Sequence, residues 1–145
     1  MTMRRTVGEL IERDALVSAP GTASVEDAAA QMAAAGCGSI LVVDGDALTG
    51  IFTERDLLLR VVGPGLDPAR TRLREVMTRA PDTIAADAPV ADAVRMMDEF
   101  SYRYLPVLDG GRIVGVLSMR HLPFADVLAM QDELAARHAI VEHLR

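Results

Sequence analysis

The chain has 145 residues, of which 50% are apolar and 25% are charged, and its formal net charge is −6. A chain of this length buries roughly 68–70% of its unfolded surface, which suffices for one compact domain or two small units that share a core. The negative charge argues against a nucleic-acid partner, since proteins that bind the phosphate backbone carry clustered Lys and Arg. No stretch approaches the ~20 apolar residues of a membrane span, so no membrane partner is expected.

Cysteine usage indicates a reducing compartment. Cys37 is the single cysteine, so no intrachain disulfide forms and nothing marks a secreted, oxidised scaffold. We therefore expect a cytoplasmic protein. Its apolar residues are mainly aliphatic, with no Trp, two Tyr and three Phe, which favours helices packed on a sheet around an aliphatic core.

The first helix is predicted from apolar residues that recur at helical spacing after Ser24. Ser24 is the expected N-cap, with Asp27 in the capping-box position, and the helix should end near Gly36. A short strand is expected before it, around residues 15–17.

A hairpin and a second helix are predicted next along the chain. The apolar runs 40–43 and 48–52 are separated by the turn sequence Asp44-Gly45-Asp46, a pattern typical of two antiparallel strands. Thr53 is the expected cap of a helix that extends through Val62.

The pattern then repeats. Residues 63–72 begin with a stretch rich in glycine and proline and form the expected linker. A shift of 65 positions aligns residues 25–57 with residues 90–122, and ten of the 33 aligned pairs are identical. The unit of strand, helix, hairpin and helix is therefore used twice. The second copy predicts a strand at 83–85, a helix at 90–100 and a hairpin formed by 104–108 and 113–117.

One copy of about 60 residues is small for an independent domain. Its apolar run at residues 39–43 is continuous, which is typical of a strand covered on both faces. We therefore predict two copies packed sheet to sheet about a pseudo-two-fold axis, with two equivalent clefts between them.

The sequence Gly50-Ile-Phe-Thr-Glu-Arg-Asp-Leu57, which follows Ser39-Ile-Leu-Val-Val-Asp44, closely resembles the cystathionine β-synthase (CBS) domain. The tandem arrangement resembles a Bateman module over about residues 7 to 122. The resemblance implies an α/β (α+β) fold with CBS repeats at 7–62 and 73–122, followed by a C-terminal helix at 123–145. It further implies a non-enzymatic regulatory module that binds AMP, ADP or ATP, or else S-adenosylmethionine or NAD(H). Such pairs commonly form homodimers and act on another protein, here unidentified.

The resemblance also assigns the nucleotide site. Asp56 would accept hydrogen bonds from both ribose hydroxyls, a task suited to a carboxylate with two oxygens. Thr53 would give its hydroxyl and the adjacent N–H groups to phosphate, and Arg55 would add positive charge. Adenine would lie against apolar backbone contributed by the partner copy. The other residues that the resemblance places at this site are Ser39, Ile51, Met77, Asp82, Thr83, Tyr102 and Arg103.

The second copy departs from this pattern. Ser118 replaces Thr53 and Arg120 matches Arg55, but His121 stands at the aspartate position. A neutral imidazole accepts only one hydrogen bond, so ribose affinity should fall and this cleft should be empty or adapted to another ligand.

Simpler interpretations stand beside these assignments. Thr53 and Asp56 also form a Thr-x-x-Asp capping box, which stabilises a helix without any ligand. A module whose cleft is vestigial would act as a structural platform for dimerisation. Tyr102 with its neighbour Arg103 would then simply frame the start of a strand.

Three histidines, at positions 121, 138 and 143, show no metal-ligand spacing and are expected on the solvated surface. Cys37 is expected to be a small buried residue rather than a nucleophile. No enzyme signature is present. From Phe124 onward, apolar residues recur at helical spacing and form an amphipathic stripe that packs on its own core or across a homodimer. The stripe consists of Val127, Met130, Leu134, Val141 and Leu144.

Overall fold

A computed structural model describes residues 5–11 and 16–122. The predicted C-terminal helix and its amphipathic stripe lie outside the described residues. The fold is mixed α/β with two separate sheets, as the sequence predicts. Contacts divide the described residues into two compact units, which we call the first unit (16–82) and the second unit (5–11 with 83–122). The predicted sheet-to-sheet packing with pseudo-two-fold symmetry stays a prediction.

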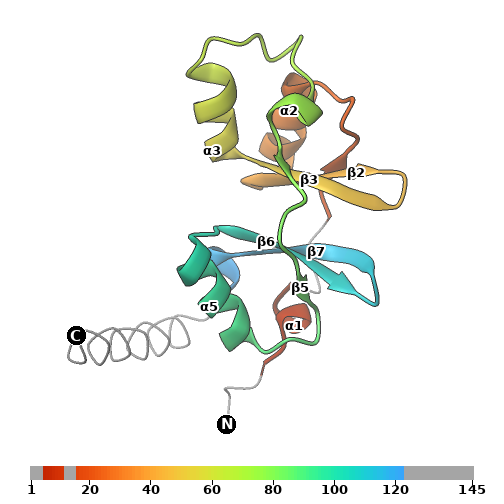
Figure 1. Ribbon diagram of the computed structural model, residues 1–145, viewed down its shortest axis with the longest axis vertical. Coiled ribbons are helices and arrows are strands. Elements are labelled where there is room, and N and C mark those ends of the chain that lie inside the picture. Colours follow the sequence, from red (N-terminus) through yellow and green to blue (C-terminus); the bar gives the residue numbers. More distant parts are fainter. Residues whose placement is uncertain (1–4, 12–15, 123–145) are drawn as a thin grey trace, which may run out of the picture. The chain divides into compact units, whose positions relative to one another are not determined.

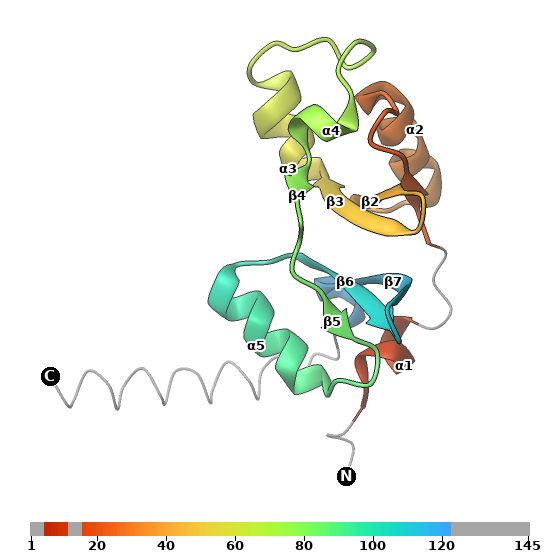
Figure 2. The same ribbon diagram turned by 45° about the vertical axis from the view of Figure 1, so that its right-hand side comes forward.

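The first unit has a four-stranded sheet in the order β1-β2-β3-β4. β1 pairs with β2 in parallel, and the other neighbours are antiparallel. The helices of this unit gather on one face of the sheet in both views (Figures 1 and 2). Its elements are β1 (Ser18–Ala19), α2 (Val25–Ala35), β2 (Ser39–Asp44), β3 (Ala47–Thr53), α3 (Glu54–Asp56), a π-helical segment (Leu57–Val62), α4 (Leu73–Val76) and β4 (Thr78–Arg79).

The second unit has a three-stranded sheet in the order β5-β6-β7. β5 and β6 are parallel, and β6 and β7 form an antiparallel hairpin. Its elements are α1 (Val7–Ile11), β5 (Ile84–Ala85), α5 (Val90–Phe100), β6 (Tyr104–Asp109), β7 (Arg112–Ser118) and a 3₁₀ turn (Met119–His121). Among the residues described in either unit, no helix has both the length and the apolar character that a membrane crossing requires.

The elements predicted from capping and turn residues are present in the structure, with small shifts in their bounds. The Ser24 hydroxyl accepts a hydrogen bond from the Asp27 N–H at 3.1 Å, and α2 ends at Gly36, whose φ of 65° suits a residue without a side chain. The strand expected around 15–17 lies at Ser18–Ala19 instead. Both predicted hairpins form, and both contain a register shift at the equivalent position.

The segment expected to form one regular helix from Thr53 to Val62 changes its hydrogen bonding after one turn. α3 is short, and the following residues bond to the fifth residue back, as Gly63 N–H does to the Leu58 carbonyl at 2.8 Å. Short π-helical stretches of this kind are rare inside helices. The sequence signal for the helix start was correct, but it did not predict this widening.

The opening helix of each sequence repeat packs in the folded unit that contains the sheet of the other repeat. In the second unit, the Gly8 N–H donates to the Ala86 carbonyl at 2.8 Å. In the first unit, the Arg74 N–H donates in the same manner to the Gly21 carbonyl at 3.0 Å. The folded units therefore differ from the sequence repeats 7–62 and 73–122, since α1 belongs to the second unit and α4 to the first.

Gly50 and Gly115, at equivalent positions of the two repeats, lie next to side chains at the ends of α4 and α1. A Cβ at Gly115 in β7 would lie 2.8 Å from the Cδ1 atom of Ile11, and a Cβ at Gly50 in β3 would collide with the Met77 side chain. Each glycine thus leaves room for an apolar side chain at the end of α1 or α4. Each unit packs around its own apolar core.

The Asp44 carboxylate ties the hairpin of the first unit to the loop before α2. It accepts hydrogen bonds from the Gly21 N–H and the Thr49 hydroxyl, each at 2.9 Å. The Gly21 bond, the Thr49 bond and the charge of Arg74 lower the pKa of Asp44 below its usual value of 3.8.

We predict that Gly115→Ala destabilises the protein by about 1–3 kcal/mol, because its new methyl overlaps the buried Ile11 side chain. Ile11→Val alone should cost about 0.5–1.5 kcal/mol. The double variant removes the overlapping Cδ1 atom, so it should be more stable than the sum of the two single changes predicts. Urea unfolding of the four proteins measures the coupling, and strictly additive effects would contradict this packing.

Asp44→Asn is predicted to have an effect on stability that depends on pH. The folded-state pKa of Asp44 lies below its unfolded value near 3.8, so the stabilising contribution is present above that pH and is lost as pH falls through the folded value. The difference in unfolding free energy between wild type and Asp44→Asn should therefore shrink below about pH 4. Chemical denaturation of the two proteins from pH 3 to pH 7 measures this difference, and a difference that stays constant over that range would contradict the prediction.

Candidate functional site

Thr53 and Asp56, around which the site is predicted, lie at the junction of β3 and α3. The Thr53 N–H donates to Asp56 Oδ2 at 3.0 Å, and the Asp56 N–H donates to Thr53 Oγ1 at 3.2 Å. Opposite Thr53 in the sheet register lies Ser39, which is buried. The capping-box interpretation is thus confirmed, and it leaves the Thr53 hydroxyl hydrogen able to donate elsewhere.

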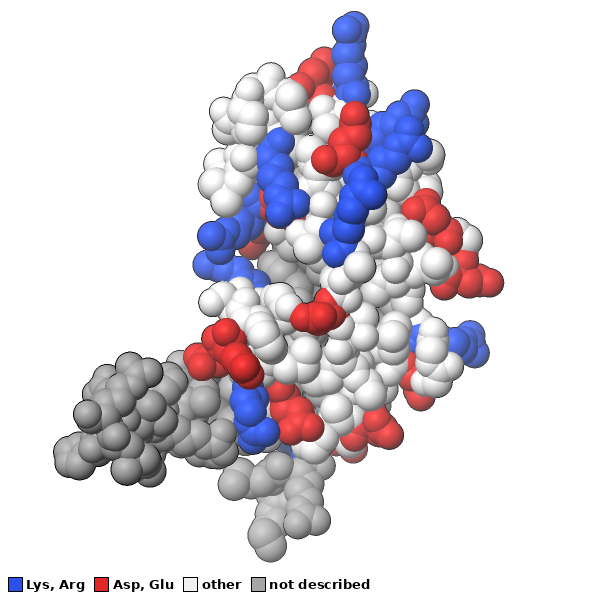
Figure 3. All heavy atoms as spheres, viewed as in Figure 1, with Lys and Arg blue, Asp and Glu red and all other residues white. Residues whose placement is uncertain are grey.

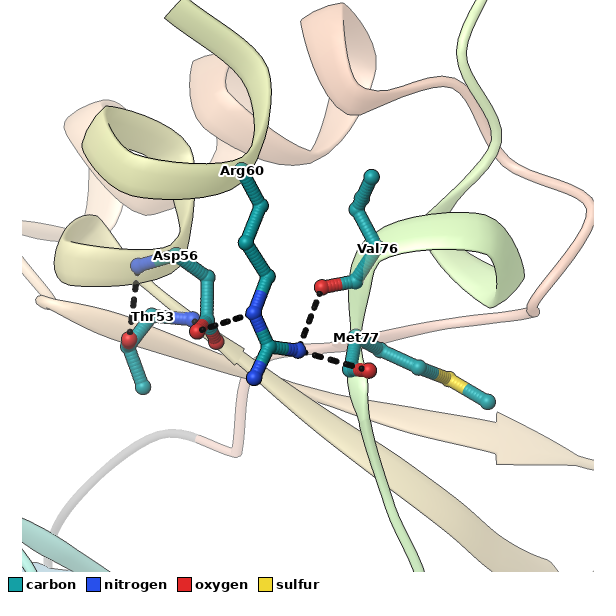
Figure 4. A network of polar contacts seen from close by, with 5 residues as sticks. All are labelled: Thr53, Asp56, Arg60, Val76 and Met77. Carbon is teal, nitrogen blue, oxygen red and sulfur yellow. Dashed lines mark hydrogen bonds and ion pairs between the residues drawn. The ribbon is translucent and has the colours of Figure 1, made fainter. Parts of the chain in front are cut away.

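Asp56 also contacts an arginine that the sequence interpretation missed. Arg60 Nε lies 3.6 Å from Asp56 Oδ1, and Arg60 Nη1 donates to the carbonyl oxygens of Val76 and Met77, each at 3.1 Å (Figure 4). The only signal in the sequence is the spacing of four residues between opposite charges on a helix. That spacing predicts the ion pair but not the contacts with α4.

The hydrogen-bonding capacity of Asp56 decides what the site does chemically. An ionised carboxylate offers about four acceptor positions. The Thr53 N–H takes one of these, and Arg60 faces another. About two positions remain, which matches the two hydroxyls of a ribose. The Asp56 side chain is 12% exposed, so only a small part of it is accessible to a ligand.

Three further predicted residues lie in the same unit. Ile51 in β3 and Met77 after α4 are both buried, whereas Arg55 is exposed to solvent. Met77 packs beside Gly50, and Ile51 pairs with Thr78 of β4. The first unit therefore brings together Ser39, Ile51, Thr53, Arg55, Asp56 and Met77.

The remaining residues predicted for adenine lie at the end of the first unit or in the second. Asp82 closes the first unit and Thr83 opens the second. The Tyr102 ring stacks on Phe100 with a centroid distance of 5.5 Å, and Arg103 is exposed. That these residues complete the site of Asp56 stays a prediction.

The second copy builds a modified version of the same turn. The Ser118 N–H donates to Nδ1 of His121 at 2.9 Å, where the first copy uses a carboxylate oxygen. Because Nδ1 accepts this bond, a neutral imidazole carries its hydrogen on Nε2 and has no acceptor left for a ribose. Arg120, the counterpart of Arg55, is exposed.

Basic residues are numerous in the later part of the first unit. Six arginines lie between residues 55 and 79, and basic side chains gather over the first unit on the face shown in Figure 3. Such a surface favours an anionic ligand although the whole chain is acidic. Over residues 5–11 and 16–122, no group of three or more His, Cys, Asp or Glu side chains is placed to hold a metal ion. His138 and His143 lie outside the described residues.

Comparison with known proteins identifies the family. The CBS domain model matches residues 7–63 and 73–125. The chain belongs to the CBS domain family and carries two copies of the domain. This agrees with the two sheets and the repeated hairpins described above.

Individual CBS proteins are similar over most of the chain. A CBS domain protein from Pyrobaculum aerophilum, solved in complex with AMP, has a TM-score of 0.77 at 28% identity, covering 88% of this chain and 98% of that one. A hexameric CBS-CP12 protein from bloom-forming cyanobacteria has a TM-score of 0.77 at 26% identity, covering 84% of this chain and 68% of that one. The CBS domain-containing protein CBSCBSPB2 of Arabidopsis thaliana is 38% identical over 71% of this chain. The chain spans 12%, 52% and 19% of the lengths of three curated relatives, the last of them CBSCBSPB2.

Thr53→Val is predicted to destabilise the first unit by about 0.5–2 kcal/mol, because it removes the hydroxyl that accepts the Asp56 N–H. Thr53→Ser keeps that oxygen and should lose much less. Urea unfolding monitored by circular dichroism measures both values. A loss for Thr53→Ser as large as that for Thr53→Val would contradict the assignment of the effect to the hydroxyl cap.

Proposed function

We propose that the protein is a regulatory module that binds an adenine nucleotide at Asp56 and modulates a partner protein. The observation that carries this proposal is the buried Asp56 carboxylate with about two acceptor positions left for a ribose. The similarity to a CBS protein solved with AMP supports the choice of ligand class. AMP, ADP and ATP are the first candidates, with S-adenosylmethionine and NAD(H) after them.

Phosphate would be held next to the ribose. The Thr53 hydroxyl keeps its hydrogen for donation, because its oxygen accepts the Asp56 N–H. Arg55 lies two residues further along the chain and is exposed, so its guanidinium is accessible to an anion. Ribose and phosphate recognition thus come from one turn of the chain.

The second copy would bind no adenosine of its own. The His121 ring accepts one hydrogen bond from Ser118 and offers no second acceptor. We therefore expect one nucleotide per chain.

The role is regulatory rather than catalytic in this proposal. A nucleotide shifts a protein between two states only through a difference in its affinity for them. A ligand bound at Asp56 would act in this way on the arrangement of the two CBS repeats and so on a cytoplasmic partner whose identity is open.

A second candidate function is a platform for self-association. Four large apolar side chains on one continuous segment of the first unit are exposed, each by 45% or more. Exposed apolar patches of this kind mark interaction surfaces. The hexameric cyanobacterial relative supports self-association, and we expect a homodimer. The side chains are those of Leu58, Leu59, Val62 and Leu66.

The platform function predicts a loss of assembly without a loss of ligand. Leu59→Glu places a charge in the exposed apolar patch and should convert a homodimer to monomers in light scattering after gel filtration. Glu54→Gln, on the neighbouring turn, is the control and should leave the mass unchanged. A Leu59→Glu protein that keeps the wild-type mass would remove this segment from any interface.

For the nucleotide site, Asp56→Asn is the decisive variant. It keeps the size of the side chain but removes the negative charge and replaces one acceptor oxygen by an NH₂ group, which cannot accept hydrogen bonds from hydroxyl or guanidinium donors. Wild type should gain about 2.7 kcal/mol of stability at AMP concentrations 100 times the dissociation constant, and Asp56→Asn should gain almost none. Thermal unfolding with and without AMP measures the gain.

The matched control is Asp67→Asn, which removes an exposed aspartate paired with Arg70 in the same unit. Its response to AMP should equal that of wild type. Calorimetric titration of wild type with AMP, ADP, ATP, NADH and S-adenosylmethionine gives the ligand and the stoichiometry. No heat with any of them would refute the proposed function.

A further inference from the structure

We infer that Arg60 is a positioning residue of the nucleotide site and couples the Asp56 carboxylate to the backbone of Val76 and Met77. This inference rests on the proposed function, because it concerns how the site at Asp56 is prepared and how its occupancy is transmitted.

The geometry shows one side chain that spans two elements. Arg60 Nε faces Asp56 Oδ1 at 3.6 Å, while Nη1 donates to both carbonyls at 3.1 Å (Figure 4). An ordinary ion pair along a helix has no reason to reach carbonyls 16 and 17 residues away. The planar guanidinium fixes the directions of its donors, so the carboxylate and the two carbonyls are held at a set separation.

The carbonyls concerned lie at the end of α4. Val76 is the last residue of that helix and Met77 is its C-cap, so both carbonyls lie where a helix lacks its own donors and where a cation is favourable. The chain then passes directly into β4, which pairs with β3. A displacement of Arg60 therefore acts on the segment that leads out of the first unit at Asp82.

Of the contacts that Arg60 makes with Asp56, Val76 and Met77, the contact with Asp56 is the longest and therefore the weakest. A distance of 3.6 Å exceeds that of a good hydrogen bond, whereas the two carbonyl contacts are within the normal range. Arg60 thus orients the carboxylate without occupying all of its acceptor capacity. Ribose hydroxyls that bind Asp56 donate to the same carboxylate that Arg60 faces and shift its position, and the α4 end responds.

The second copy lacks both members of this pair. At the positions 65 residues further on, the sequence has His121 for Asp56 and Ala125 for Arg60. The acceptor and its arginine are therefore present together in the first copy and absent together in the second.

The test compares Arg60→Met, which keeps the aliphatic stem but no donor, with Arg60→Lys, which keeps the charge but not the planar fork. Arg72→Met is the matched control, because Arg72 Nη1 also donates to a carbonyl of the first unit, that of Thr22, at 2.9 Å. AMP titration calorimetry gives the dissociation constant. Hydrogen exchange of the segment 76–83, with and without AMP, reports the transmitted change.

Arg60→Met should weaken AMP binding about 10-fold, because the Asp56 carboxylate loses the cation that orients it, and should reduce the protection that AMP confers on residues 76–83. Arg60→Lys should lie between it and wild type, and Arg72→Met should match wild type in both measurements. If Arg60→Met does not fold, the Arg60→Lys protein decides by the same two readouts.

The outcomes separate this inference from the proposed function. Wild-type AMP binding with unchanged affinity and unchanged protection in Arg60→Met overturns the positioning role and leaves the proposed function intact. Reduced stability of Arg60→Met with wild-type affinity overturns it as well, since the role of Arg60 would then be structural. A wild-type protein that binds no adenosine ligand refutes both.

Discussion

The Asp56 carboxylate has to satisfy several donors from one partly enclosed position. The backbone N–H groups of Asp56 and Thr53 donate the hydrogen bonds that close the turn between β3 and α3. The Oδ1 atom of Asp56 faces Arg60. A buried acceptor that lacked these donors would be costly. The same requirement fixes the direction of the chain after β3 and the position of the α4 end, so the local turn and the candidate site are one arrangement.

The exchange of the opening helices between the two repeats determines which residues surround Asp56. α4 belongs by sequence to the second CBS repeat, yet it packs in the first unit and supplies the carbonyls that Arg60 holds. Gly50 allows this by leaving room for the side chain that follows α4. The surroundings of Asp56 are thus made from both repeats even within a single folded unit, and neither repeat alone contains them.

The sequence predicted the elements whose signals are local and repeated. Ser24, Gly36 and the two hairpins follow from capping and turn chemistry, and the shift of 65 residues predicted that they occur twice. The capping pair of Thr53 and Asp56 was also predictable. The contacts of Arg60 with the end of α4 were not, because its partners at Val76 and Met77 are backbone atoms, which leave no trace in residue type.

The exchange of α1 and α4 escaped prediction for a similar reason. Periodicity shows that a segment is a helix, and a repeat shows that two segments are equivalent, but neither shows which copy of a sheet a helix packs on. The only hint was a glycine in each final strand of the hairpins. The change to π-helical bonding after Asp56 likewise has no signal in residue type.

The two copies separate the capping role of this turn from the binding role that we propose for it. A cap needs one acceptor, and Nδ1 of His121 provides it for Ser118 as well as a carboxylate oxygen does for Thr53. Capping therefore explains why a polar residue stands at each position, but it does not explain why the first copy has a carboxylate. The second oxygen of Asp56 is the difference, and it is the oxygen that Arg60 faces. Ribose recognition requires that extra acceptor capacity, which is why the ligand is expected in the first copy alone.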